Sequence, residues 1–161
     1  MNTALERVAR ELHLADPAQE RLRLAFGHAC VLRVQALVEQ PRVLDCLAGL
    51  GRYLEGGLDR AQFDALVAQA GQLANQHQGS ASLDGCGHAA VSASYAVAKA
   101  LAGKALEAAD YAAYATVYGQ GGYGAVAERD SFAPEYAWQA ACLAALALAA
   151  GAPLPAGQES A

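Results

Sequence analysis

The sequence predicts an all-α fold, a compact bundle or a short array of about six to seven alanine-rich helices. Hydrophobic residues make up 55% of the 161 residues while aromatic residues make up 7%, so most apolar side chains are those of 41 alanines. Alanine is the strongest helix former, and its small side chain lets helices approach closely. Apolar residues recur at steps of three and four, and the β-branched and aromatic runs typical of strands are scarce.

Capping residues, prolines and glycines divide the chain into these helices. Asn2 or Thr3 caps the first, Asp16 followed by Pro17 starts the second, and Asp59 caps the fourth. The predicted helices are approximately residues 3–13, 17–39, 41–55, 60–77, 87–101, 104–118 and 134–150.

The C-terminal third adds three expectations. Four glycines lie among residues 119–124, so we expect this segment to break the sixth helix or to join it to the next, as the most flexible loop of the chain. The last helix is apolar almost all round, which predicts a central position in the bundle. We expect residues 1–151 to form one helical domain and residues 152–161 to be a disordered tail.

The formal net charge of −5 is unevenly spread and bears on partners and location. Residues 1–60 carry eight arginines against eight acidic residues, whereas residues 61–161 carry three basic residues against eight acidic ones. This balance argues against a nucleic-acid partner, and it favours either simple solubility or an acidic face for a basic protein. The chain shows neither a signal-sequence pattern nor an apolar run long enough for a membrane span, so we expect a cytoplasmic protein without a membrane partner.

Catalytic and metal-binding motifs are weak. There is no phosphate loop, nucleophile elbow, paired C-x-x-C or H-E-x-x-H pattern. His28 and Cys30 lie two apart in a predicted helix and point to different sides, whereas Cys86 and His88 straddle a helix start and could share a metal or form a reactive thiol pair. Buried, reduced cysteines are the better interpretation. We expect no catalytic residue, no bound metal and no cofactor.

Tyrosines give the stronger functional signal. Five of the seven lie between Tyr95 and Tyr123, and helical spacing puts several of them with acidic residues on one stripe of the sixth helix. Tyrosine is enriched at protein interfaces, although such rings also pack within bundles with their hydroxyl groups reaching water. The predicted partner-binding residues are Asp84, Tyr95, Glu107, Asp110, Tyr111, Tyr114, Tyr118, Tyr123, Glu128 and Asp130.

Residues 87–96 read GHAAVSASYA, and residues 106–115 contain an Ala-Ala-x-Tyr-Ala pattern. These two segments resemble the Gly-His-Ala-Ala stretch and the Ala-Ala-x-Tyr-Ala pattern of a family of alanine-rich, all-helical immunity proteins of bacterial polymorphic toxin systems. The order of elements from Pro41-Arg42 to the helix capped by Asp59 is also similar, with Tyr53 where the family usually has Trp. The resemblance implies a non-enzymatic protein that binds one cognate toxin in the producing cell and blocks it.

Three functions follow as hypotheses. The first is an immunity protein whose tyrosine- and carboxylate-rich helix face covers a toxin with a basic surface. The alternative is a helical-repeat or scaffold-like interaction domain, which repeated helix pairs would indicate. The third is a small enzyme or cofactor binder that uses Cys86, His88 and residues 119–124.

Overall fold

The structure, a computed structural model, describes residues 1–76 and 86–152. Within these ranges the chain forms seven α-helices and no strand, which confirms the all-α prediction. The helices are α1 (Thr3–Glu11), α2 (Glu20–Leu32), α3 (Pro41–Leu54), α4 (Arg60–Gln76), α5 (Cys86–Leu101), α6 (Ala105–Ala127) and α7 (Ala133–Ala149). Short 3-10 turns are η1 (Pro17–Gln19), η2 (Gln35–Leu37) and η3 (Arg129–Phe132).

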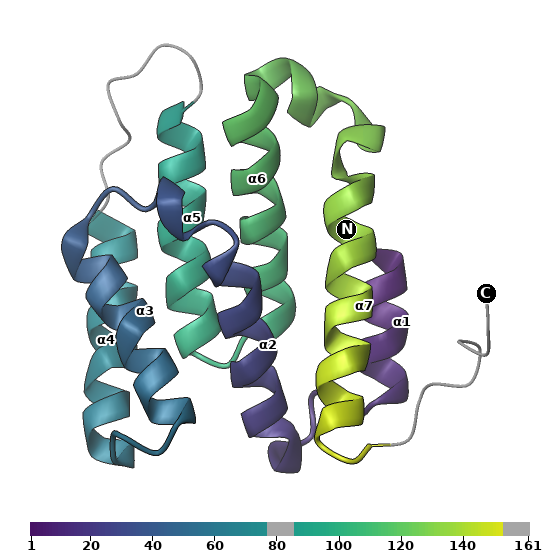
Figure 1. Ribbon diagram of the computed structural model, residues 1–161. Coiled ribbons are helices and arrows are strands. Elements are labelled where there is room, and N and C mark those ends of the chain that lie inside the picture. Colours follow the sequence, from purple (N-terminus) through teal and green to yellow (C-terminus); the bar gives the residue numbers. More distant parts are fainter. Residues whose placement is uncertain (77–85, 153–161) are drawn as a thin grey trace.

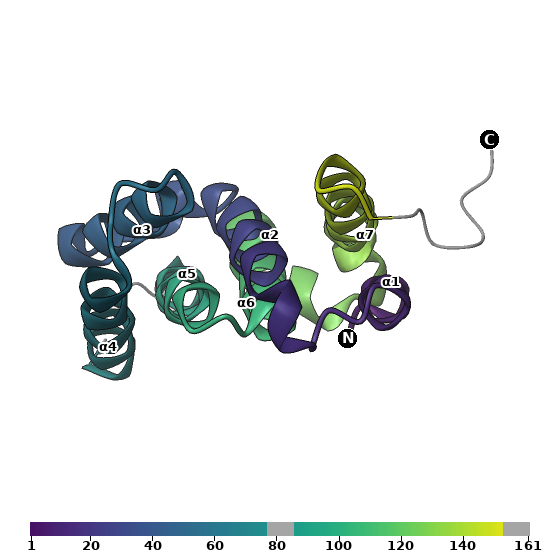
Figure 2. The same cartoon turned by 90° about the horizontal axis from the view of Figure 1, so that it is seen from below.

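The helices are arranged around α5 and α6, which pack against each other along their length. Helix α2 packs on both of them, α3 and α4 lie on one side, and α1 and α7 pair on the other (Figures 1 and 2). The expectation that the last helix is central is therefore wrong. Helix α7 lies at the edge because most of its apolar residues are alanines, which tolerate exposure to water, and Leu148 is 52% exposed.

Small residues bring the central helices into close contact. The buried residues of α5 and α6 are mainly alanines, and a Cβ atom added to Gly27 of α2 would lie 3.1 Å from the Cβ of Ala100. Larger side chains from the neighbouring helices, such as Phe26 and Phe63, fill the remaining core space. The many alanines of the sequence therefore allow the helices around α5 and α6 to pack closely.

Polar contacts attach α1 and α7 to this centre. The Asn2 side chain caps α1 by accepting a hydrogen bond from the Leu5 N–H (3.1 Å), and its Nδ2 donates to the Tyr136 carbonyl and to Gln139 Oε1. Buried Gln139 in turn donates to the Ala109 carbonyl of α6 (2.8 Å). These contacts fix the position of α1 and α7 beside α6.

An ion pair makes a second connection to α7. Arg33, just after α2, binds Glu135 at 2.8 Å and lies over the Trp138 ring, with 4.0 Å from the guanidinium carbon to the ring centroid. Glu135 is only 4% exposed. Arg33 also donates through Nε, so the carboxylate is held at both oxygens.

Several predicted boundaries need correction. The second helix ends at Leu32 instead of near Glu39, because Val34 leaves helical geometry and the residue before Pro41 is held extended. The predicted break of the sixth helix is present at Gly122, whose φ of 62° favours glycine, but residues 119–124 are not a loop, because helical turns continue on either side of this kink. Of the predicted tail 152–161, only Ala152 is described, and it packs partly against the core.

Candidate protein-binding surface

A row of aromatic rings follows α6 and continues to the start of α7. Neighbouring ring centroids in it are 5.2 to 6.2 Å apart, so each ring contacts the next. We call this set the aromatic row; its members are His88, Tyr114, Tyr118, Tyr123, Phe132 and Tyr136.

The row is partly open to solvent. Tyr123 is 59% exposed and Tyr114 is 42% exposed, whereas Phe132 is buried in a small hydrophobic cluster with Ala113 and Val117. This cluster is separate from the main core, and the Tyr114 ring packs against its Phe132. Such rings offer apolar area and hydroxyl groups in fixed positions, which are the properties of interface anchors.

Local sequence explains how the row forms. Tyr114 and Tyr118 lie four apart on α6 and so share one face, with 6.2 Å between their centroids. The break at Gly122 redirects the following turn, and the Tyr123 ring packs edge-on against both His88 of α5 and Tyr118. A residue other than glycine at position 122 would strain this turn and move the exposed Tyr123 ring.

The other predicted tyrosines form a separate group. Tyr95 stacks on Tyr111 at 5.3 Å, and its hydroxyl donates to Asn75 of α4 at 3.4 Å. Glu107, on the same α6 stripe, pairs with Lys99 at 2.7 Å. Both tyrosines are half-buried. The predicted stripe on α6 therefore has two parts. Glu107 and Tyr111 contact side chains of α5, whereas Tyr114 and Tyr118 belong to the aromatic row.

The predicted acidic residues are scattered. Glu128 and Asp130 are exposed, one at the end of α6 and one in η3, beyond the aromatic row. Asp110 is half-buried on the side of α6 that faces α1; burial, with smaller contributions from Glu6 and Glu107, raises the pKa of its carboxyl group, and the nearby N-terminal amino group opposes that rise. Asp84 lies outside the described residues.

Sequence reasoning missed part of this surface. His88 is predicted only as a metal or catalytic candidate, yet its ring stacks on Tyr118 at 5.6 Å. Phe132 and Tyr136 are absent from the predicted set, although both belong to the aromatic row. The clustering of aromatic residues after position 110 was the available signal, but their meeting depends on the η3 turn between α6 and α7.

The described cysteines are poorly suited to nucleophilic chemistry. Burial raises the pKa values of the Cys30, Cys46 and Cys142 thiols, and burial lowers the pKa of His28. No three or more His, Cys, Asp or Glu side chains meet closely enough to hold a metal ion within residues 1–76 and 87–152. The side chain of Cys86, the other predicted metal or catalytic candidate, lies outside the described set.

Comparisons with known protein families, curated proteins and solved structures find no match for this chain. In the parts of the chain that the structure describes, no helix is both long enough and apolar enough to cross a membrane. Functional inference therefore rests on the surface itself.

Proposed function

We propose that this protein is an immunity protein that binds a cognate bacterial toxin and blocks it, and that the aromatic row is the centre of the binding surface. The observation that carries this proposal is the exposure of Tyr114 and Tyr123 on rings that are already packed against one another. The resemblance of residues 87–96 and 106–115 to alanine-rich immunity proteins supports the choice of a toxin as partner.

Prior packing of the rings favours tight binding. A side chain that is already held in one conformation loses little entropy when a partner covers it. In the aromatic row, Tyr118 contacts three other rings, those of His88, Tyr114 and Tyr123. Tyrosine anchors of this kind supply large contact area with few rotatable bonds.

The charge of the surrounding surface favours a basic partner. Glu128 and Asp130, on either side of exposed Arg129, are exposed beyond the aromatic row, and residues 61–161 as a whole carry the entire net charge of −5. Electrostatic complementarity speeds association and disfavours wrong partners. A toxin that acts on an anionic substrate would present the matching positive surface.

A helical-repeat scaffold is the less favoured alternative. In a repeat array each helix pair contacts only its neighbours in sequence. Here α1 packs against α7, so helices from opposite ends of the described chain lie side by side (Figure 1). This contact is typical of a closed bundle.

Site-specific photocrosslinking tests the proposal. A benzoylphenylalanine placed at Tyr123 is expected to capture one protein in the producing cell, and the same group at exposed Arg42 of α3 is expected to capture none of it. The captured protein, expressed alone in a host, should be toxic, and co-expression of this chain should restore growth. A captured protein without toxicity, or toxicity that this chain leaves unchanged, would contradict the immunity function.

A further inference from the structure

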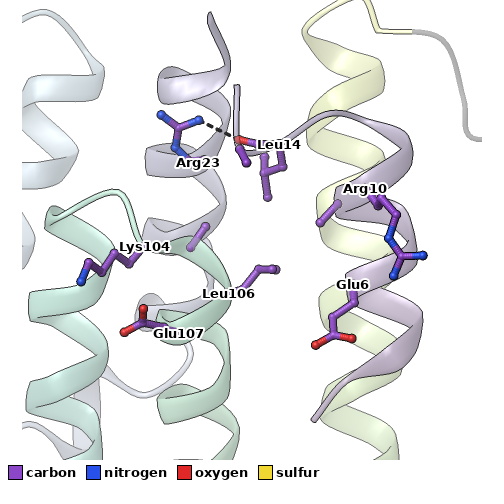
Figure 3. A pocket seen from close by; sticks show the side chains of 10 residues that line it. Glu6, Arg10, Leu14, Arg23, Lys104, Leu106 and Glu107 are labelled. Carbon is purple, nitrogen blue, oxygen red and sulfur yellow. Dashed lines mark hydrogen bonds between the residues drawn. The ribbon is translucent and has the colours of Figure 1, made fainter. Parts of the chain in front are cut away.

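Two separate open pockets of similar volume lie beside α1. The first, of about 440 Å³, lies between the end of α1 and the start of α6, and Figure 3 shows Leu106 pointing into the gap from α6. Charged side chains of both signs line this first pocket: Arg10, Arg23, Lys104, Glu6 and Glu107. This mixture of charges does not favour a ligand of either sign.

The second pocket has a different lining. Its volume is about 450 Å³, and it is bounded by the start of α1, by α6, and by the segment from η3 to the start of α7. We call it the α1–η3 pocket. Its apolar and aromatic walls are Met1, Tyr114, Val126, Phe132 and Tyr136. A volume of this size with mostly apolar walls and a few polar groups is typical of small-molecule sites.

The polar groups of the α1–η3 pocket favour a negatively charged ligand. Among the described residues that line it, Arg129 is the one charged side chain, and no carboxylate, amide or imidazole accompanies it. A guanidinium group can only donate hydrogen bonds, and the Thr3 hydroxyl adds another donor. Neither side chain has a hydrogen bond or ion pair with any residue that the structure describes. Both can therefore donate to an acceptor that enters the pocket.

Three carboxylates lie near this pocket without lining it. Glu128 and Asp130 flank Arg129 in the sequence, but both are exposed and neither pairs with it in the described structure. Burial, with a smaller contribution from Asp110, raises the pKa of the Tyr136 hydroxyl. The N-terminal amino group donates to that hydroxyl at 3.2 Å and opposes the charge of Asp110. Water screens the exposed carboxylates, whereas a ligand in contact with Arg129 would pair with it directly.

We propose that the α1–η3 pocket binds a small aromatic carboxylic acid. The ring of the ligand packs against Tyr114, Phe132 and Tyr136, which are held by their own contacts at centroid distances of 5.2 and 5.5 Å. The carboxylate of the ligand accepts hydrogen bonds from Arg129, whose planar guanidinium matches the geometry of a carboxylate, and from the Thr3 hydroxyl.

This inference goes beyond the proposed function and does not depend on it. The ligand is a small molecule, and its binding can be measured on the full chain without any toxin. Tyr114 lines the α1–η3 pocket and also belongs to the aromatic row, so a bound acid would lie beside the surface to which we assign partner binding.

Three small compounds test the charge preference. Phenylacetate, phenylacetamide and phenethylamine share one aromatic ring and differ in the charge of the group attached to it. Titrations followed by NMR measure the binding of each compound to the full chain. We expect phenylacetate to bind with a dissociation constant on the order of 1 mM, as is usual for ligands of this size. Phenethylamine should bind at least about fivefold more weakly, because Arg129 repels its charge, and phenylacetamide should lie between them.

A first pair of variants tests the role of Arg129. Arg129→Gln should remove the preference for phenylacetate over phenylacetamide, whereas Arg42→Gln, which removes an exposed guanidinium on α3, should leave the preference unchanged. Circular dichroism checks that both variants fold.

A second pair tests the place of binding. Thr3→Phe puts a ring at the lining of the pocket and should weaken the binding of phenylacetate at least about tenfold, a change that is easily measured. Ala4→Phe puts the same ring on the next, exposed residue of α1, which does not line the pocket, and should leave the affinity unchanged. In the wild-type chain, phenylacetate should shift the methyl signals of Thr3 and Val126.

Four results would each overturn the inference. They are the absence of phenylacetate binding at about 10 mM, tenfold above the expected dissociation constant, equal affinity for phenethylamine, a preference that Arg129→Gln leaves intact, and binding that Thr3→Phe does not weaken. Capture of a toxin at Tyr123 is a separate measurement, so the immunity function can fail while the acid binds, and the acid can fail to bind while the immunity function stands.

Discussion

The centre of the molecule and its α1–α7 edge are both rich in alanine, but they are held together in different ways. In the centre, α2 crosses α5 at Gly27 and Ala100 so closely that even a Cβ atom at position 27 would lie only 3.1 Å from the Cβ of Ala100. At the edge, α7 leaves Leu148 half exposed and depends on buried Gln139 and Glu135 for its attachment. Contacts between alanines thus hold helices together where they approach closely, whereas polar contacts hold helices that lie further apart.

The difference between the two regions also has a functional side. Helix α1 is attached mainly to α7, and two open pockets of about 440 and 450 Å³ lie where α1 and its N-terminal residues approach α6. In the centre, α5 packs closely on α6. We therefore expect a partner to bind near this edge, where the pockets lie.

The largest expected effect is in the centre. Gly27→Val should destabilise the protein by about 3 kcal/mol, because its side chain would meet the Cβ and the backbone of Ala100 at 3.1 to 3.2 Å. Chemical denaturation measures the loss. The matched control is Gly71→Ala in α4, where a Cβ meets nothing within 4 Å; it should stabilise the protein by up to about 1 kcal/mol. A neutral Gly27→Val would contradict the close crossing of α2 and α5.

The ion pair at the edge should give the next effect. Arg33→Met is expected to cost about 2 kcal/mol, because it leaves the 4% exposed Glu135 carboxylate without its partner. Adding Glu135→Leu should recover at least half of this loss, since no buried charge then remains. Chemical denaturation of the single and the double variant measures the loss of stability and its recovery. A double variant less stable than Arg33→Met would show that the pair contributes more than it costs.

A smaller effect is expected from the N-cap of α1. Asn2→Ala should cost about 1 kcal/mol through the loss of the cap and of the hydrogen bonds to the Tyr136 carbonyl and to Gln139. Amide hydrogen exchange should rise in α1 and at the start of α7, and should stay unchanged in α5. Faster exchange throughout the molecule would mean that the two regions do not differ in their attachment.

The smallest effect concerns Asp110, and it depends on pH. The pKa of this carboxyl group is raised in the folded protein, which means that its charged form is less favourable there than in the unfolded chain. The free energy of unfolding therefore falls as the pH rises from the ordinary pKa of aspartate to the raised pKa of the folded protein. Asp110→Asn should therefore raise Tm at pH 7 by about 1–2 °C. The gain should shrink at pH 3, which lies below the ordinary pKa of an aspartate, because protonation removes the charge that burial disfavours. Thermal unfolding at both pH values measures it, and a lower Tm at pH 7 would contradict the prediction.

Local patterns in the sequence were sufficient for much of the fold. Asn2 and Asp59 act as caps, and Asp59 forms a reciprocal pair of hydrogen bonds with Gln62 at the start of α4. The position of α7 could not be predicted in the same way. An alanine-rich helix is apolar on every side, so its pattern does not show which side is buried or whether the helix is central.

The candidate surface was only partly predictable for a similar reason. Spacing along α6 placed Tyr114 and Tyr118 on one face, because that inference needs only helical geometry. The contact of His88 with Tyr118 requires the packing of α5 on α6, and the entry of Phe132 requires the η3 turn. Neither contact can be inferred from the spacing of residues along one helix. The pairing of Tyr95 with Tyr111 likewise became visible only once the two helices were placed side by side.

The most direct test of the account is the affinity of the crosslinked toxin for the wild-type chain and for a variant of the aromatic row. Tyr114→Ala combined with Tyr123→Ala removes the two exposed tyrosine rings and leaves buried Phe132 in place. We predict that the double variant folds with a Tm close to that of the wild type, binds the toxin at least about a hundredfold more weakly and no longer protects cells. Unchanged affinity and full protection would contradict the assignment of the aromatic row as the binding surface.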